Sequence, residues 1–74
     1  MNQKLEPNQI APDGVAFDVD VDRFTVGTSI FIPCINTTKA LQQVRRVTRL
    51  TPDQTEHRVV IEAGKYGLRV WRVL

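Results

Sequence analysis

The stretch HRVVIEAGKYGLRVWRVL, residues 57–74, contains two β-rich runs separated by two glycines. Gly64 and Gly67 can adopt the positive φ values that a tight loop requires. Alternating apolar and polar residues flank them, as in the strands of a hairpin. The sequence therefore predicts a β-hairpin at the end of the chain.

The register of this hairpin follows from its apolar pattern. With Ala63 placed opposite Leu68, one face collects Val59, Ile61, Ala63, Leu68, Val70 and Leu74. The other face then sets Glu62 opposite Arg69, a favourable cross-strand pair. We expect one helix to cover the apolar face, on the side of Val59, Ile61 and Val70.

Trp71 lies on the opposite, mixed face of the predicted hairpin, with Arg58 and Arg69 beside it. One interpretation is a partly exposed ring that stacks on a nucleic-acid base or packs on a partner. The other is a ring covered by the N-terminal strand or by a second subunit, because a small domain seldom leaves its largest apolar side chain in water.

A helix is predicted for KALQQVRRVTRL, residues 39–50. Its apolar residues fall on one stripe at helical spacing: Ala40, Leu41, Val44, Val47 and Leu50. Asn36, Thr37 and Thr38 supply capping oxygens before it, and Pro52 stops it.

The exposed side of this helix is basic. Residues 39–49 carry four positive charges and no acid, so the helix has no internal ion pairs of its own. Arg45, Arg46 and Arg49 are candidates for binding phosphate oxygens, which match the planar guanidinium fork. The alternative is that they pair with the acids of an earlier run of the same fold: Asp18, Asp20 and Asp22.

Those acids belong to VAFDVDVD, residues 15–22, whose alternation predicts a half-buried strand. A turn at 26–28 and a β-branched run, SIFIPCI, residues 29–35, follow, and Pro33 ends the run or places it at a sheet edge. Residues 1–14 show no periodicity. We expect a mobile N-terminal arm over 1–14 and a single domain over 15–74.

Composition restricts the function classes. The 74 residues, 42% hydrophobic and 24% charged, suit one small globular domain. No apolar run approaches the roughly 20 residues that span a bilayer. The N-terminus lacks the pattern of a secretory signal, so we expect a cytoplasmic protein without membrane contact. Residues 1–24 carry a net charge of −3 and residues 25–74 a net charge of +5, which favours a polyanionic partner or an internal match of charge.

Catalytic motifs are incomplete. FDVDVDR places acids as a calcium loop does, but Arg23 stands where that loop needs glycine and Ser29 where it needs glutamate. His57 and Cys34 are the only residues of their kinds, which leaves no metal cluster and no thiol–imidazole pair. We therefore expect no enzymatic activity, no catalytic residues, no bound metal and no cofactor.

Two phrases, VGTSIFIP at 26–33 and GLRVWRV at 67–73, resemble short orphan proteins encoded by tailed bacteriophages. The resemblance covers residues 24–74, although Thr28 stands where an acid is expected. It implies a viral protein that works in the cytoplasm of a bacterial host, and it brings no activity with it.

Together these patterns predict an α+β fold of order β-β-α-β-β, with one helix packed on one face of a small antiparallel sheet. The leading function is nucleic-acid binding through the helix and hairpin, with six candidate residues: Arg45, Arg46, Arg49, Arg58, Arg69 and Trp71. The alternative is an interaction module that binds or inhibits a host protein, with Trp71 and Arg69 as anchors. Exposed strand edges also make a homodimer plausible.

Overall fold

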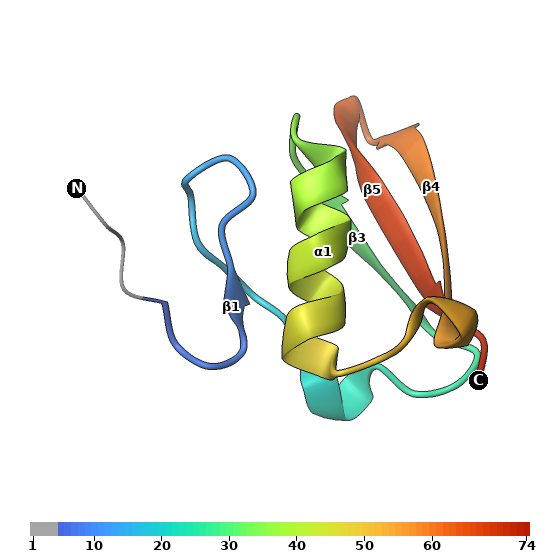
Figure 1. The fold of residues 1–74 in the computed structure, drawn as a ribbon. Coiled ribbons are helices and arrows are strands. Elements are labelled where there is room, and N and C mark those ends of the chain that lie inside the picture. Colours follow the sequence, from blue (N-terminus) through green and yellow to red (C-terminus); the bar gives the residue numbers. More distant parts are fainter. Residues whose placement is uncertain (1–4) are drawn as a thin grey trace.

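The computed structural model describes residues 5–74. Its elements, in chain order, are β1 (Gln9–Ile10), β2 (Phe17–Asp18), the 3-10 helix η1 (Val21–Arg23), β3 (Ser29–Pro33), α1 (Thr37–Thr48), the 3-10 helix η2 (Pro52–Gln54), β4 (Thr55–Glu62) and β5 (Lys65–Arg72). A three-stranded antiparallel sheet has the order β3-β5-β4, and β1 pairs with β2. Helix α1 lies between the sheet and the N-terminal segment (Figure 1).

The fold class is α+β, as predicted, but three strands precede the helix rather than two. The predicted strand over 15–22 is shortened to β2. After it the Asp20 carboxylate accepts the backbone N–H of Arg23 at 3.3 Å and caps η1. This local bond competes with strand pairing, as short acidic side chains often do. The alternation of FDVDVD therefore does not extend into a long strand.

The N-terminal segment is part of the packed structure. Ile10 is fully buried, and the Ala11 N–H donates to the Gln43 side chain of α1 at 2.9 Å. The Asp13 carboxylate accepts the backbone N–H groups of Ile35 and Asn36 at 2.7 and 2.9 Å. An apolar anchor and polar ties therefore hold the described part of this segment against α1, while the mobility expected over residues 1–14 stays a prediction. Residues 1–4 of the predicted arm lie outside the described residues.

The predicted hairpin forms in a different register. Ala63 and Gly64 make a two-residue loop with φ values of 51° and 76°, and Glu62 lies opposite Lys65. Positive φ at both loop positions defines a type I′ turn, whose twist matches that of the strands. Leu68 consequently lies opposite Val59 instead of Ala63. The shift is an even number of residues, so every side chain keeps its predicted face.

Gly67, which was expected in the hairpin loop, sits inside the central strand. A Cβ atom there would lie 2.3 Å from the carbonyl oxygen of Ile32 and 2.9 Å from the Phe31 ring. Because glycine has no side chain, β3 can approach β5 closely at this point, and the Phe31 ring lies where a side chain at residue 67 would be. The tertiary contact with β3 explains why this glycine is not available to the loop.

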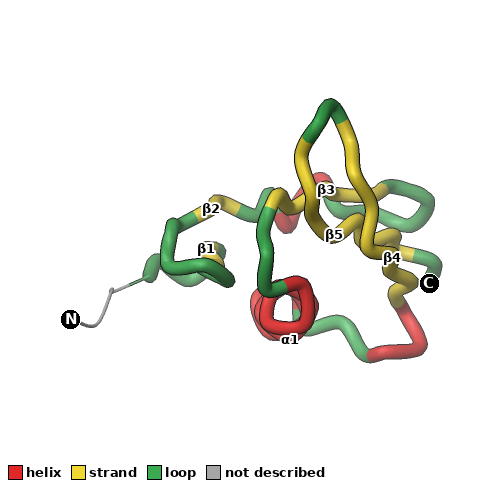
Figure 2. The backbone as a smooth tube through the Cα atoms, turned by 90° about the horizontal axis from the view of Figure 1, so that it is seen from above, coloured by secondary structure: helices red, strands yellow, loops and turns green. Residues whose placement is uncertain are grey.

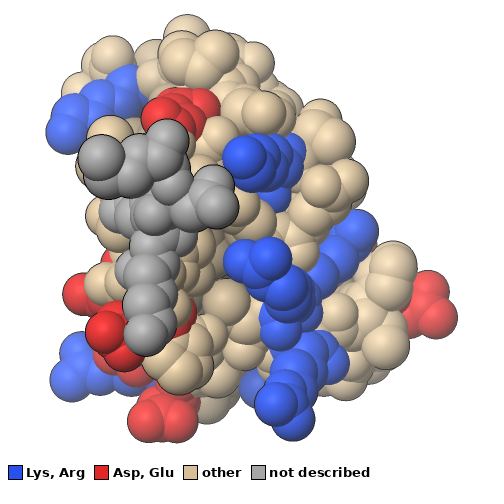
Figure 3. Space-filling view, turned by 60° about the vertical axis from the view of Figure 1, so that its left-hand side comes forward, with Lys and Arg blue, Asp and Glu red and all other residues tan. Residues whose placement is uncertain are grey.

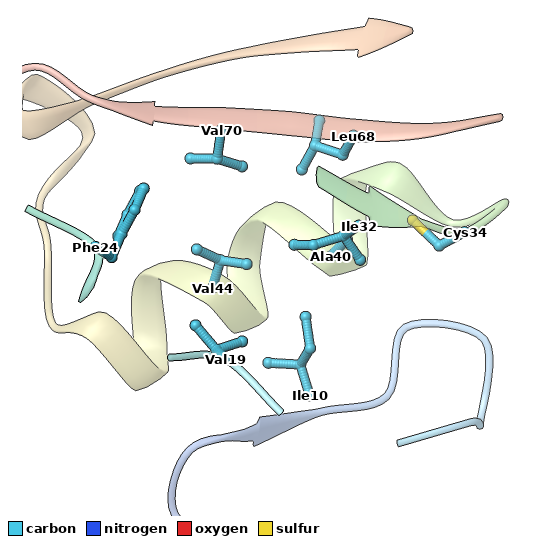
Figure 4. Packing of buried hydrophobic residues seen from close by; sticks show 9 residues of the cluster. All are labelled: Ile10, Val19, Phe24, Ile32, Cys34, Ala40, Val44, Leu68 and Val70. Atoms are coloured by element: carbon cyan, nitrogen blue, oxygen red, sulfur yellow. The ribbon is translucent and has the colours of Figure 1, made fainter. Parts of the chain in front are cut away.

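The core lies between α1 and the sheet, and the N-terminal segment closes its other side. Its buried residues are Ile10, Val19, Phe24, Ile32, Cys34, Ala40, Val44, Leu68 and Val70. Figure 4 shows Leu68 and Val70 approaching from β5 and Ile10 and Val19 from the N-terminal segment, with α1 between them.

The helix covers Val70 as expected: it packs mainly against the central strand β5, and it contacts β4 at the buried Thr55, whose hydroxyl accepts the Arg45 Nε–H. Val59 and Ile61 of β4 are 46% and 71% exposed. A helix about 10 Å wide spans roughly two strands spaced about 4.8 Å apart. The part of β4 that contains Val59 and Ile61 is therefore left without a complete covering layer on that side.

Candidate functional site

The outward side of α1 carries the basic residues Lys39, Arg45, Arg46 and Arg49, here called the basic helix face. Helix α1 begins where the Asn36 side chain accepts the N–H of Lys39 at 3.1 Å, and it turns Ala40 and Val44 into the core. Helical periodicity then places the basic residues away from the core: Lys39, Arg46 and Arg49 are exposed and Arg45 is half-buried. Figure 3 shows Lys and Arg side chains gathered in a column on this part of the surface.

The arginines of the basic helix face have no carboxylate partner within ion-pair distance. All eight acidic residues of the chain fall within residues 5–74, where the ion pairs are Arg23 with Asp20 and Arg69 with Glu62. Asp18 instead accepts a hydrogen bond from Gln9 at 2.9 Å. The alternative in which the early aspartates pair with Arg45, Arg46 and Arg49 is therefore not what the structure contains.

Two weaker restraints act on this face. The Arg45 Nε donates to the Thr55 hydroxyl at a long 3.4 Å. Glu6 lines a hollow of about 390 Å³ together with Arg46 and Arg49, although no ion pair forms. The ion pairs of residues 5–74 involve none of the four cations, so the face keeps an excess of positive charge.

The other three candidate residues lie on the far side of the sheet. Arg58, Arg69 and Trp71 point to the face of β4 and β5 that turns away from α1, as the alternation of the paired strands requires. The view along the molecule in Figure 2 separates α1 from that face. The six residues therefore form two separate surfaces, one on the helix and one on the sheet.

Arg69 is occupied by contacts within the chain. Its guanidinium donates two hydrogen bonds to the Glu62 carboxylate and a third to the Ser29 hydroxyl at 2.7 Å, and it lies 5.6 Å from the centre of the Phe31 ring. The hydrogen bonds from Arg69 lower the pKa of Glu62, and the same bonds raise the pKa of Arg69. The sequence anticipated this partner, although in the observed register Lys65 lies opposite Glu62 and Arg58 lies opposite Arg69. Arg69 is a structural residue of the sheet.

Trp71 borders a hollow of about 380 Å³ whose other walls include Val26, Glu56, Arg58 and Val73. The ring is half-buried, and the N-terminal strands lie beyond α1, so they do not cover it. Sequence reasoning missed Glu56, which lies directly opposite Trp71. The two-residue Ala63–Gly64 turn was the signal that would have placed it there.

The two arginine side chains beside Trp71 differ in whether contacts within the chain hold them. Arg72 donates to the carbonyl oxygens of Phe24 and Leu74 at 3.0 and 3.1 Å, so its guanidinium is held by the backbone. Arg58 has no ion pair within the described part of the chain, residues 5–74. An aromatic ring, an unpaired guanidinium and the Glu56 carboxylate therefore meet at one hollow.

The remaining reactive groups are isolated. Cys34 is buried, and burial raises its pKa, which opposes formation of the thiolate. Over residues 5–74, His, Cys, Asp and Glu side chains nowhere gather in groups of three that could hold a metal ion. Within the same residues, no helix has the length and apolar character needed to cross a bilayer.

Comparisons with protein-family models, with curated proteins and with solved structures find no match to this chain.

Proposed function

We propose that the protein binds nucleic acid through the basic helix face. The observation that carries this proposal is that Arg45, Arg46 and Arg49 share one side of α1 without an ion-paired carboxylate in residues 5–74. An unpaired guanidinium keeps its planar set of donors for phosphate oxygens. Neighbouring arginines three and four residues apart also repel each other. An external polyanion would remove that repulsion.

The dimensions of the face suit a nucleic-acid backbone. Lys39 and Arg49 are ten residues apart, which corresponds to about 15 Å along a helix. Phosphates of one strand of a duplex follow each other at about 3.4 Å along its axis, so the face can reach about four of them. Contacts of this kind position a protein without reading sequence. We therefore propose binding with little sequence preference.

A salt titration tests this proposal. Binding to a generic duplex should weaken steeply between about 50 and 200 mM salt, and the triple variant Arg45→Ala, Arg46→Ala, Arg49→Ala should lower the salt slope by about three units. Arg23→Ala is the matched control, because Arg23 is an exposed arginine paired with Asp20. Absence of binding at low salt, or an unchanged slope in the triple variant, would refute nucleic-acid binding by this face.

A substitution of Arg49 distinguishes effects on folding stability from effects on nucleic-acid binding. It ends α1 in a left-handed conformation with φ of 59°, which glycine adopts more easily. Arg49→Gly should therefore stabilise the fold by up to about 1 kcal/mol in chemical denaturation while it weakens nucleic-acid binding. A variant that is more stable and binds equally well would remove Arg49 from the interface.

A second candidate function is binding of a host protein at the Trp71 hollow. A half-buried aromatic ring beside the unpaired Arg58 has the composition of an interaction hot spot. A partner at this site should be lost with Trp71→Ala and retained by the triple arginine variant. Equal capture of the same proteins by Trp71→Ala and by the unaltered chain would exclude Trp71 as an anchor.

Both candidates are binding roles, and we propose no catalysis. The resemblance to bacteriophage proteins and the bacterial cytoplasm that it implies agree with either one. Both remain predictions.

A further inference from the structure

Strand β4 forms an open edge of the three-stranded sheet. In the order β3-β5-β4 it has a partner on one side, and no segment of residues 5–74 pairs with its other side. It is eight residues long and contains no proline, whereas the opposite edge strand β3 has five residues and ends at Pro33. A long edge is a template for a further strand, and the charged side chains that can protect an edge are of both signs on β4.

The hydrogen bonds of β5 show which groups of β4 face outward. Arg72 donates its N–H to the Thr28 carbonyl at 3.0 Å and accepts the Gly27 N–H at 2.8 Å, both on the β3 side. Thr55, opposite Arg72, is therefore not bonded to it. Because antiparallel pairs alternate between bonded and non-bonded, the free N–H and C=O groups of β4 belong to Thr55, His57, Val59 and Ile61.

The side chains of this edge divide between the two faces of the sheet. Val59 and Ile61 are 46% and 71% exposed on the side of α1, and a hollow of about 270 Å³ lies between Val59 and the first turns of the helix. Arg58 and Glu62 lie on the other face. The edge thus presents apolar side chains on one face and opposite charges on the other.

We infer that two copies of the chain pair through β4, antiparallel and related by a two-fold axis through Val60. In this arrangement Val59 of each copy lies opposite Ile61 of the other, and these residues supply the outward N–H and C=O groups that a bonded pair exchanges. On the opposite face Arg58 of each copy lies opposite Glu62 of the other. Apolar groups and opposite charges are thereby matched twice.

Neighbouring registers do not have this match. An axis through Val59 sets Glu62 opposite Glu56 of the second copy, and an axis through Arg58 sets two arginines against each other. An axis through Ile61 leaves Arg58 and Glu62 without charged partners. Like charges directly opposite each other destabilise a strand pair. An axis through His57 also sets Arg58 opposite Glu56 of the second copy, but it places Val59 opposite Thr55 and leaves Glu62 outside the strand pair. The axis through Val60 therefore gives the register that matches both the apolar and the charged side chains.

Glu62 can serve both partners. It accepts two hydrogen bonds from Arg69 of its own chain, and a carboxylate has acceptor sites for a second arginine. The paired sheets then form six strands, with both α1 helices on the same face. The dimer is a property of the β4 edge and does not depend on nucleic-acid binding.

Sedimentation of the full chain without nucleic acid tests this inference between about 1 µM and about 1 mM. The mass should rise from 8.4 kDa towards twice that value as concentration increases. Arg58→Glu and Glu62→Lys should each weaken dimerisation at least about tenfold, because each creates two like-charge pairs. Lys39→Glu, the same change of charge on α1, should leave it unaltered.

An equimolar mixture of Arg58→Glu and Glu62→Lys supplies the decisive measurement. In the mixed dimer both cross-strand pairs again join opposite charges, so association should return to within about threefold of the original. Circular dichroism of each variant checks its fold. Should Glu62→Lys unfold through loss of the Arg69 contact, Ile61→Lys replaces it as the disrupting variant, because Ile61 is 71% exposed and supports no core contact.

Three results would overturn the inference. The first is a monomer at every concentration. The second is a dimer that Arg58→Glu or Ile61→Lys leaves unchanged. The third is a mixture of folded charge variants that stays monomeric.

Discussion

The N-terminal segment, residues 5–24, and the C-terminal hairpin, residues 55–72, become ordered by different means. The hairpin pairs eight residues with eight across a two-residue turn. The N-terminal strands have two residues each, and the segment is held by buried Ile10, Val19 and Phe24 together with Asp13 at the start of α1. Local alternation is enough to specify the hairpin, whereas the N-terminal segment depends on contacts with residues far away in the chain.

The largest expected effect on this difference comes from removing a buried apolar side chain of the N-terminal segment. Ile10→Ala should reduce the free energy of unfolding by about 2–5 kcal/mol, because Ile10 is fully buried beside α1. The measurement is chemical denaturation followed by circular dichroism. Val15→Ala is the control, since Val15 is 67% exposed and should change stability little. Equal effects of the two would mean that the segment contributes nothing to the core.

A second prediction asks whether the hairpin also depends on a distant contact. Gly67→Ala places a Cβ against the Ile32 carbonyl and the Phe31 ring of β3, and should destabilise the fold by about 1–3 kcal/mol. Lys65→Ala, an exposed change on the same strand, is the comparison. If Gly67→Ala were neutral, the close approach of β3 would not need glycine, and the hairpin would be entirely local.

A third prediction concerns a substitution that makes the turn sequence of the hairpin more favourable. Ala63 has φ of 51°, a conformation that asparagine tolerates better than alanine and that the Asn-Gly turn favours. Ala63→Asn should raise the free energy of unfolding by about 0.5–1 kcal/mol. Thermal and chemical denaturation should both show the gain. A loss of stability would argue against the type I′ turn.

The smallest expected effect is a pH dependence shared by both regions. Backbone N–H groups of Asn36 and Ile35 lower the pKa of Asp13, and Arg69 lowers the pKa of Glu62. A carboxyl whose pKa is lowered by folding stabilises the fold above its unfolded-state pKa, and this contribution is lost as pH falls through the folded-state pKa.

The thermal midpoint should therefore decrease below about pH 4. Asp13→Asn should reduce the part of this decrease in thermal midpoint that comes from the N-terminal segment. Glu62→Gln should reduce the part that comes from the hairpin. A decrease that neither substitution changes would place the acid sensitivity elsewhere in the chain.

The elements that sequence reasoning predicted well are those with local causes. Asn36 caps α1, Ala40 and Val44 face the core, and Glu62 binds Arg69. The candidate arginines of the helix lie on its outward side as periodicity required. Two errors concern distant contacts: Ile10 in the core and Gly67 beneath Phe31. The third, Glu56 opposite Trp71, concerns the hairpin register, which the Ala63–Gly64 turn sets locally.

By itself the sequence determined the helix, the hairpin, and the face on which each of their side chains lies, because spacing along a strand or helix sets direction. Only the tertiary structure decided that α1 packs mainly on β5 and leaves Val59 and Ile61 of β4 exposed, and that the helix arginines and Trp71 occupy opposite sides of the molecule. The reason is physical: the width of a helix and the order of the strands are properties of assembled layers, and no local pattern encodes them.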